Sequence, residues 1–312
     1  MGLYHCHGAD MDFAMKKKEL SDSLRQLQTR KTKKDKYQVH CSTNREELQN
    51  MEQKKKLKCE LYNDNFQNYK SYNIPAKAQL VITDIPYNIG NNAYGSNPSW
   101  YVGGDNANGE SKLAGKSFFR TDNNFNIAEY FHFCARLLKK EPKERNQAPA
   151  MIVFCSWQQI PLVQKYGEKA GFKNSYPLYF IKKSSTQALK AHMKIVGATE
   201  LAMVLYRDKL PKFRNKWHED EYGKKMILNW FDWQTDNRKI YPKCHPTQKP
   251  IAVLKQLIKT FTDEGDIVID PCAGSGSTLR AAYELGRPSY GFEVDKGFYK
   301  AAKESMLNVE EK

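Results

Sequence analysis

The sequence predicts an α/β domain with a doubly wound sheet, and three observations carry that prediction. From Leu57 onward, short apolar segments typical of buried strands alternate with amphipathic helical segments. Two of the strands run directly into polar or glycine-rich turns, as ligand-binding strands do at the carboxyl edge of doubly wound sheets. The chain has 312 residues, enough for one large domain or two modest ones whose core needs no disulfide bonds.

The strands are predicted from apolar runs or apolar–polar alternation, each ending in acidic or turn residues. The helices are predicted from apolar residues that recur at intervals of three and four. In chain order the expected strands are 57–62, 79–83, 151–155, 175–181, 200–206, 267–269 and 289–293. The expected helices are 127–140, 160–170, 250–261, 277–285 and 296–308.

Four parts of the chain differ in amino-acid composition. Residues 1–56 are polar, with lysine runs and leucines at helical spacing, and are interpreted as a basic helical extension. Residues 57–206 form the catalytic part of the domain, with a Gly-, Asn- and Ser-rich loop at 88–125 of the kind that forms lids or binding loops. Residues 207–244 interleave cations with aromatic side chains, and residues 245–312 form the cofactor-binding part.

The charge balance favours a polyanionic partner, with nucleic acid as the leading candidate. Fifty Lys and Arg stand against 35 Asp and Glu, a formal net charge of +15. The excess is regional, because residues 182–249 carry 15 basic and 7 acidic side chains while residues 261–312 carry 6 and 10. The alternative is a basic surface that only keeps the protein soluble.

Cysteine usage and hydropathy favour a cytoplasmic protein without a membrane segment. The seven cysteines are scattered and contain no C-x-x-C pair. No apolar run approaches the 18 or so residues of a membrane span, and no signal-peptide pattern precedes a cleavage site. The triplet His5-Cys6-His7 cannot by itself give a zinc ion tetrahedral ligands, so no metal site is expected.

The first chemical motif is a glycine-rich turn between a buried strand and a helix. The strand ends at Asp270, and the residues of the turn and the helix start that would contact a cofactor are Cys272, Gly274, Gly276, Ser277 and Thr278. No lysine follows Gly276, which excludes a P-loop, and Leu279 stands where a dinucleotide fingerprint needs a small residue. Glu293 ends the next strand, where its carboxylate could accept both hydroxyls of a ribose. This combination suits S-adenosylmethionine, and the alternative is an ordinary strand-to-helix turn.

The second motif is Asp84-Ile85-Pro86-Tyr87, directly after the apolar strand 79–83. The amino groups of adenine and cytosine are poor nucleophiles because their lone pair is delocalised into the ring. The Asp84 carboxylate and the Ile85 carbonyl could accept both N–H groups and turn that lone pair toward a methyl donor. Pro86 would stiffen the turn, and Tyr87 could stack on an extruded base. Taken alone, this tetrapeptide could also be a plain turn.

With both motifs in place, the chain resembles the S-adenosylmethionine-dependent DNA amino-methyltransferases of the N6-adenine/N4-cytosine family, in their permuted β-type order. Asp84–Tyr87 precedes Asp270–Thr278, as the catalytic and glycine motifs do in that order. The resemblance implies that Asp64 contacts the adenine or ribose of the cofactor. It also implies that Thr247, Gln248 and Lys249, within the segment 245–250, close over the methionine end.

The same resemblance implies a seven-stranded, mostly parallel sheet with helices on both faces, base flipping in double-stranded DNA, and direct methyl transfer without a covalent intermediate. It implies a homodimer as well. An aspartate in the first position of the tetrapeptide favours N6 of adenine over N4 of cytosine. The enzyme would belong to a restriction–modification system or act as an orphan methylase, with residues 207–244 and the loop 88–125 recognising the target.

Two residues depart from the family pattern. Ile85 replaces a proline but keeps the backbone carbonyl that the chemistry uses, and Cys272 replaces a phenylalanine that packs on the cofactor. Pro271-Cys272 imitates the nucleophilic pair of cytosine-C5 methyltransferases, a hypothesis rejected because this cysteine lies inside the cofactor turn. Three rivals stay open: an N4-cytosine enzyme, a catalytically silent DNA-binding subunit, and an enzyme that methylates RNA or a protein amide.

Overall fold

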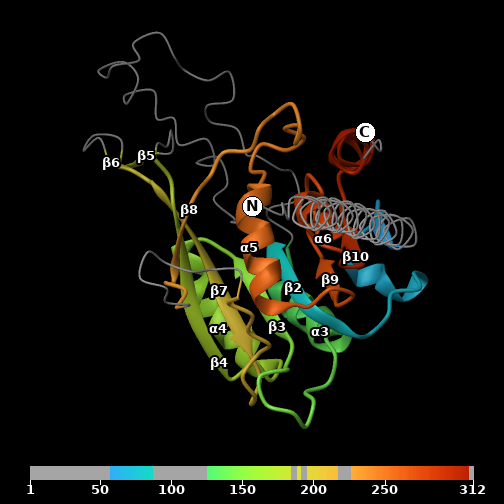
Figure 1. Ribbon diagram of the computed structural model, residues 1–312, viewed down its shortest axis with the longest axis vertical. Coiled ribbons are helices and arrows are strands. Elements are labelled where there is room, and N and C mark those ends of the chain that lie inside the picture. Colours follow the sequence, from blue (N-terminus) through green and yellow to red (C-terminus); the bar gives the residue numbers. More distant parts are fainter. Residues whose placement is uncertain (1–56, 87–124, 184–187, 191–194, 217–225, 309–312) are drawn as a thin grey trace, which may run out of the picture. The chain divides into compact units, whose positions relative to one another are not determined.

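The computed structural model describes residues 57–86, 125–183, 188–190, 195–216 and 226–308 (Figure 1). Several sequence predictions lie outside this part of the chain. They are the extension 1–56 with its His5-Cys6-His7 triplet, Tyr87, nearly all of the loop 88–125, and residues 217–225 with Lys224 and Lys225. Residues 57–312 form one compact unit.

The described residues form an eight-stranded sheet with the order β1-β10-β9-β2-β3-β7-β4-β8. Seven strands run in one direction, and β7 is antiparallel to both of its neighbours. The strands are β1 (Cys59–Tyr62), β2 (Ala78–Asp84), β3 (Ala150–Phe154), β4 (Asn174–Ile181), β7 (Thr199–Tyr206), β8 (Trp230–Asp232), β9 (Ile267–Asp270) and β10 (Ser289–Phe292). A separate hairpin pairs β5 (Ala188–Lys190) with β6 (Ile195–Val196).

Helices cover both faces of the sheet, which confirms the predicted doubly wound class (Figure 1). The helices α3 (Ile127–Leu137) and α4 (Ile160–Lys169) pack on one face, and α5 (Ile251–Phe261) and α6 (Ser277–Glu284) on the other. Every residue of β3 is buried, because a central strand is covered on both sides. The 3₁₀ helix η1 (Phe66–Ser71) follows β1, and α7 (Lys296–Ala301) continues into the π-helical turn η6 (Ala302–Met306).

Each predicted strand and helix appears, with small shifts at the ends. Helix α3 stops at Leu137 instead of Lys140, because the backbone turns extended at Leu138 and the Lys139 N–H donates to the Ala78 carbonyl at 3.0 Å. The sheet has eight strands where seven were expected. The additional strand, β8, comes from the predicted recognition insertion and is held to β4 by ladder bonds and by stacking of Phe231 on Phe180, with ring centroids 5.4 Å apart.

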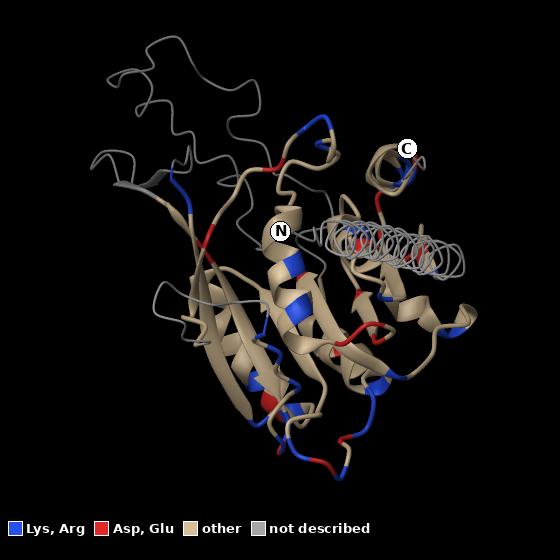
Figure 2. Ribbon diagram, viewed as in Figure 1, with Lys and Arg blue, Asp and Glu red and all other residues tan. Residues whose placement is uncertain are grey.

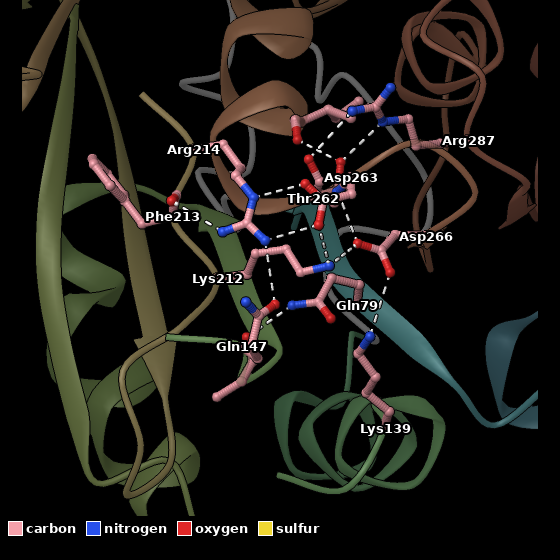
Figure 3. Close-up of polar contacts among 12 residues, drawn as sticks. Gln79, Lys139, Gln147, Lys212, Phe213, Arg214, Thr262, Asp263, Asp266 and Arg287 are labelled. Atoms are coloured by element: carbon pink, nitrogen blue, oxygen red, sulfur yellow. Dashed lines mark hydrogen bonds and ion pairs between the residues drawn. The ribbon is translucent and has the colours of Figure 1, made fainter. Parts of the chain in front are cut away.

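A polar cluster ties the start of that insertion to the amino edge of the sheet (Figure 3). The Lys212 ammonium lies 2.5 Å from Asp266 and 2.8 Å from Asp263, and the Arg214 guanidinium donates twice to Asp263, at 2.7 and 2.9 Å. Lys139 approaches Asp266 from the end of α3 at 3.4 Å. Lys212 and Arg214, two cations of the predicted recognition insertion, therefore brace the fold at the edge opposite the predicted site.

No helix in the part of the chain that the structure describes combines the length and the apolar character needed to cross a membrane.

Candidate functional site

The predicted site residues converge because four neighbouring strands, β1, β10, β9 and β2, are parallel and end at one edge of the sheet (Figure 1). Asp64 follows β1, Glu293 follows β10, Asp270 ends β9 and Asp84 ends β2. A crevice at this edge is where doubly wound sheets bind their ligands. The order of the strands therefore places the glycine turn of β9 directly beside the tetrapeptide of β2.

The glycine turn requires two glycines in the left-handed region. Gly274 has φ 51° and Gly276 has φ 73°, conformations in which a side chain is strained. A Cβ atom at Gly274 would lie 3.4 Å from the His245 ring. Ser277 and Thr278 begin α6 and are buried. The predicted strand–turn–helix is thus present, and the His245 ring packs against the bare Gly274 backbone.

Glu293 organises this turn as well as facing the predicted cofactor site. One carboxylate oxygen accepts the Gly274 N–H at 2.9 Å and the other accepts the Asp295 N–H at 2.7 Å. Burial raises the pKa of the Glu293 carboxyl. The Val294 N–H is a third backbone donor to this carboxylate, so part of its acceptor capacity remains for ligand hydroxyls.

Asp270, which is buried, and Cys272, which is half-buried, belong to the same turn. Burial, together with the nearby carboxylates Asp84 and Glu293, raises the pKa of Asp270 to about 7, although Thr278 and the Cys272 N–H donate to it. Burial and the Asp270 and Glu293 carboxylates raise the pKa of the Cys272 thiol well above 9. A thiol in this state is not a nucleophile at neutral pH, which agrees with the rejection of the cytosine-C5 hypothesis.

The tetrapeptide is held by two neighbours that the sequence did not single out. The Ile85 N–H donates to the Phe154 carbonyl of β3 at 3.2 Å. The Gln159 amide donates to the Pro86 carbonyl at 2.7 Å, while its own oxygen accepts the Ser156 N–H at 3.0 Å. No local pattern marks Gln159 as functional, because its role depends on β3 lying beside β2.

Lys249 connects the segment 245–250 to the tetrapeptide at the end of β2. Its ammonium lies 2.5 Å from Asp84 Oδ2 and 3.8 Å from Glu200 Oε2, and its side chain is 6% exposed. Burial alone lowers the pKa of Lys249, but the Asp84 and Glu200 carboxylates outweigh burial and raise that pKa. Lys249 was expected at the methionine end of the cofactor, and the structure pairs it with Asp84 of the tetrapeptide.

Three other predicted cofactor residues have local partners. The Asp64 carboxylate accepts from the Asn65 N–H at 2.7 Å, from Asn68 at 2.8 Å and from the Tyr72 hydroxyl at 2.8 Å, which lowers the pKa of Asp64.

The predicted cofactor residues Thr247 and Gln248 also have local partners. Thr247 Oγ1 lies 3.1 Å from His245 Nδ1, and Gln248 accepts the Cys244 N–H at 3.0 Å. These side chains shape the loops around the site.

His245 is part of the quoted 245–250 motif, but no role was assigned to it. Its ring packs against Phe298, with centroids 4.3 Å apart, and against the Gly274 turn. Burial, with the cations Lys249 and Lys243, lowers the pKa of His245 to about 4 although Asp295 opposes this shift. A neutral imidazole therefore forms one wall of the turn at physiological pH.

This pKa predicts an acid-sensitive contribution to stability. Between pH 6.5 and 4 the unfolded chain protonates His245 while the folded protein does not, so the free energy of unfolding falls as the pH is lowered through this window, by on the order of 2 to 3 kcal/mol. Asp270 acts in the opposite direction, because its pKa is raised in the folded state. Urea unfolding of wild type and His245→Gln between pH 4 and 7 separates the two effects. A stability difference between the two proteins that is constant across this range would contradict the assignment.

Comparison with known proteins matches residues 78–304 to the N6/N4 methyltransferase family, described as DNA methylases. DNA adenine methyltransferase YhdJ of Escherichia coli (strain K12) is 27% identical over 253 residues, which cover 73% of this chain and 76% of YhdJ. Type II methyltransferase M.HpaI of Haemophilus parainfluenzae is 25% identical over 240 residues, 73% of this chain and 67% of M.HpaI. Other relatives are matched over less of their length: the alignments span 66% of E. coli YubD and 31% of Streptococcus pneumoniae M2.DpnII.

Two solved structures share the fold. M1.HpyAVI in complex with SAM superposes with a TM-score of 0.55 at 22% identity, over 80% of this chain and 99% of that one. The cytosine-N4-specific PvuII DNA methyltransferase superposes with a TM-score of 0.55 at 15% identity, over 80% and 86%. The family match spans β2 to the π-helical turn η6, so it includes the tetrapeptide, the segment 245–250 and the glycine turn. The chain belongs to the N6/N4 family of DNA methylases.

Proposed function

We propose that this protein transfers a methyl group from S-adenosylmethionine to N6 of an adenine flipped out of double-stranded DNA. The observation that carries the proposal is the pairing of β2 with β9, which sets the Asp84 carboxylate beside the glycine turn. One strand supplies an acceptor for an amino group and the adjacent strand a turn for a nucleotide-type cofactor. Methyl transfer needs these two elements side by side.

The residues of the turn fit S-adenosylmethionine. Glu293 keeps part of its acceptor capacity beside the turn, which suits the hydroxyls of a ribose. Burial and the nearby Asp84 and Glu293 carboxylates raise the pKa of Asp270. Three carboxyl groups close together at this edge of the sheet favour a cationic ligand over a phosphate. When bound, the cofactor supplies an electrophilic methyl group, which no side chain of the protein can provide.

The protein's own contribution is to hold the amino group. Asp84 accepts one N–H and the Ile85 carbonyl accepts the other, so that the nitrogen lone pair turns out of conjugation with the ring. Gln159 fixes the Pro86 carbonyl, and Ile85 is bonded to β3, so both acceptors stand on braced backbone. The transfer is direct and in line, with no covalent enzyme intermediate.

Cations near the carboxyl edge of the sheet, where Asp84 lies, support duplex DNA as the substrate. This edge is called the catalytic edge below. Figure 2 shows Lys and Arg in the loop that precedes α5, where Arg238, Lys239 and Lys243 are exposed. An open cavity of about 340 Å³ at the ends of β4 and β8 is lined by Lys182, Lys183 and Trp233 among others. Lysine and arginine bind phosphates, and aromatic rings stack on bases.

Adenine is proposed over cytosine because of Asp84, since aspartate at this position resembles the adenine enzymes of the family. Nucleosides released from methylated duplex DNA and resolved by mass spectrometry are expected to contain N6-methyladenine as the dominant product. Dominant N4-methylcytosine would overturn the choice of base and leave the role of Asp84 unchanged.

The same assay separates the remaining rivals when duplex DNA, tRNA and peptide compete for the methyl group. Methyl transfer to RNA or peptide in preference to DNA would replace the proposed substrate. Cofactor binding without transfer to any of the three would identify a silent subunit. The family resemblance also supports a cytoplasmic location and a homodimer. Light scattering of the purified protein tests the homodimer.

A further inference from the structure

Glu200 lies at the catalytic edge between two lysines. It is the second residue of β7, and its side chain is 15% exposed. Lys182, which follows β4, approaches Glu200 Oε1 at 2.5 Å, and Lys249 lies 3.8 Å from Glu200 Oε2. With Asp84 at the far end, carboxylates and ammonium groups alternate in the order Asp84, Lys249, Glu200, Lys182.

This arrangement poses a problem for the proposed reaction. The Lys249 ammonium lies 2.5 Å from Asp84 Oδ2, so it competes with the amino group of the target base for this carboxylate. The ammonium cannot withdraw into water, because the Lys249 side chain is 6% exposed and its Nζ lies 5.3 Å from the centroid of the Phe154 ring. A buried charge left without a counter-ion costs several kcal/mol. Lys249 therefore needs a second carboxylate if the base displaces it from Asp84.

We propose that Glu200 is a positioning residue that receives the Lys249 ammonium when the target amino group replaces it at Asp84. The inference rests on the proposed function. A movement of about 1 Å turns the 3.8 Å separation from Glu200 into a hydrogen bond of ordinary length. Lys182 holds the other Glu200 oxygen, and its own ammonium lies 4.9 Å from the centroid of the Trp233 ring, so the receiving carboxylate is anchored.

Glu200→Gln tests the proposal, because it keeps the shape of the side chain and removes its charge. Lys249 then loses the carboxylate at 3.8 Å and keeps the one at 2.5 Å, so it competes more strongly with the base for Asp84. We expect kcat to fall by about tenfold or more, while the affinities for S-adenosylmethionine and for DNA change by less than about twofold. Glu200→Asp keeps the charge at a greater distance, so its kcat is expected to lie between those of the other two proteins.

Asp266→Asn is the matched control. Asp266 is 16% exposed and also pairs with two lysines, Lys212 at 2.5 Å and Lys139 at 3.4 Å, but at the opposite edge of the sheet (Figure 3). Loss of this carboxylate is expected to lower the melting temperature at least as much as Glu200→Gln does and to leave kcat near that of wild type. The comparison separates a general loss of stability from an effect on Asp84.

A second measurement does not depend on turnover. A duplex with 2-aminopurine next to the target adenine, in the recognition sequence found by sequencing DNA that the wild type has methylated, keeps the N6 amino group of the target. It reports base extrusion by its fluorescence, because the probe loses a stacking partner when the adenine leaves the helix. Glu200→Gln is expected to lower the fluorescence of the bound duplex. In a Lys249→Met background the same substitution is expected to have no effect, because no ammonium then needs to be received.

Two results would overturn the role of Glu200: a kcat for Glu200→Gln equal to that of Asp266→Asn, or a loss of 2-aminopurine fluorescence that persists in the Lys249→Met background. Failure of the proposed function looks different. A wild-type protein that transfers no methyl group to any duplex would contradict that function, whereas an active wild type beside an equally active Glu200→Gln protein contradicts the positioning role alone.

Discussion

An Asp84→Ala protein is expected to lose at least about a thousandfold in kcat and to bind S-adenosylmethionine nearly as tightly as the wild type. The amino group of the base loses the carboxylate that would accept its proton and orient its lone pair. Glu293, which is proposed to hold the cofactor, bonds to the Gly274 and Asp295 N–H groups, whereas Asp84 pairs with Lys249. Single-turnover methylation and calorimetric titration with the cofactor measure the two quantities separately.

The Asp84–Lys249 pair adds a structural consequence that needs its own control. Removing Asp84 takes away the nearer of the two carboxylates beside the buried Lys249 ammonium and leaves Glu200, at 3.8 Å, as its counter-ion, so some loss of stability is expected. Asp84→Asn fills the same volume and keeps one oxygen acceptor, so it is expected to fold better than Asp84→Ala and still to be inactive. An active Asp84→Asn enzyme would show that the charge of Asp84 has no role in the transfer.

Glu293→Ala is expected to raise the dissociation constant for S-adenosylmethionine by about a hundredfold, before any effect on the chemical step. A hydrogen bond to a charged group contributes about 1.5 to 3 kcal/mol, and two ribose hydroxyls would lose their acceptor. The Gly274 and Asp295 N–H groups also lose their partner, so the turn itself is expected to loosen. Equilibrium dialysis gives the affinity, and methylation at saturating cofactor shows how much of kcat is recovered.

Each of these two substitutions is the control for the other. Asp84→Ala should affect turnover and spare cofactor binding, whereas Glu293→Ala should do the reverse. If both raised the dissociation constant of the cofactor equally, the separate assignment of Asp84 to the base and Glu293 to the cofactor would be wrong.

The main features of the fold and site could be predicted because they depend on residues close together in the chain. Strands such as β3 show as apolar runs, and helices such as α5 show as apolar residues at intervals of three and four. Gly274 and Gly276 stand out because the turn needs positive φ at both positions. Parallel strands then bring Asp84, Asp270 and Glu293 to one edge.

Short or context-dependent elements escaped prediction. The three-residue strand β8 exists because β4 offers a free edge and Phe180 offers a ring for Phe231 to stack on, and neither can be read from residues 230–232. The basic side chains of residues 207–216 look alike in sequence. Lys212 and Arg214 differ from exposed cations because Asp263 and Asp266, some fifty residues later, reach them at the amino edge.

By itself the sequence determined the class of fold, the order of the motifs, and the types of residue that would face a cofactor and a base, since each rests on a local pattern. Only the tertiary structure decided what those residues touch. Lys249 lies 165 positions after Asp84, and Glu200 comes from a third part of the chain, yet the three charges meet. Ion pairs of this kind leave no periodicity in sequence, because they form when separate strands align in the sheet and burial makes each charge require a partner.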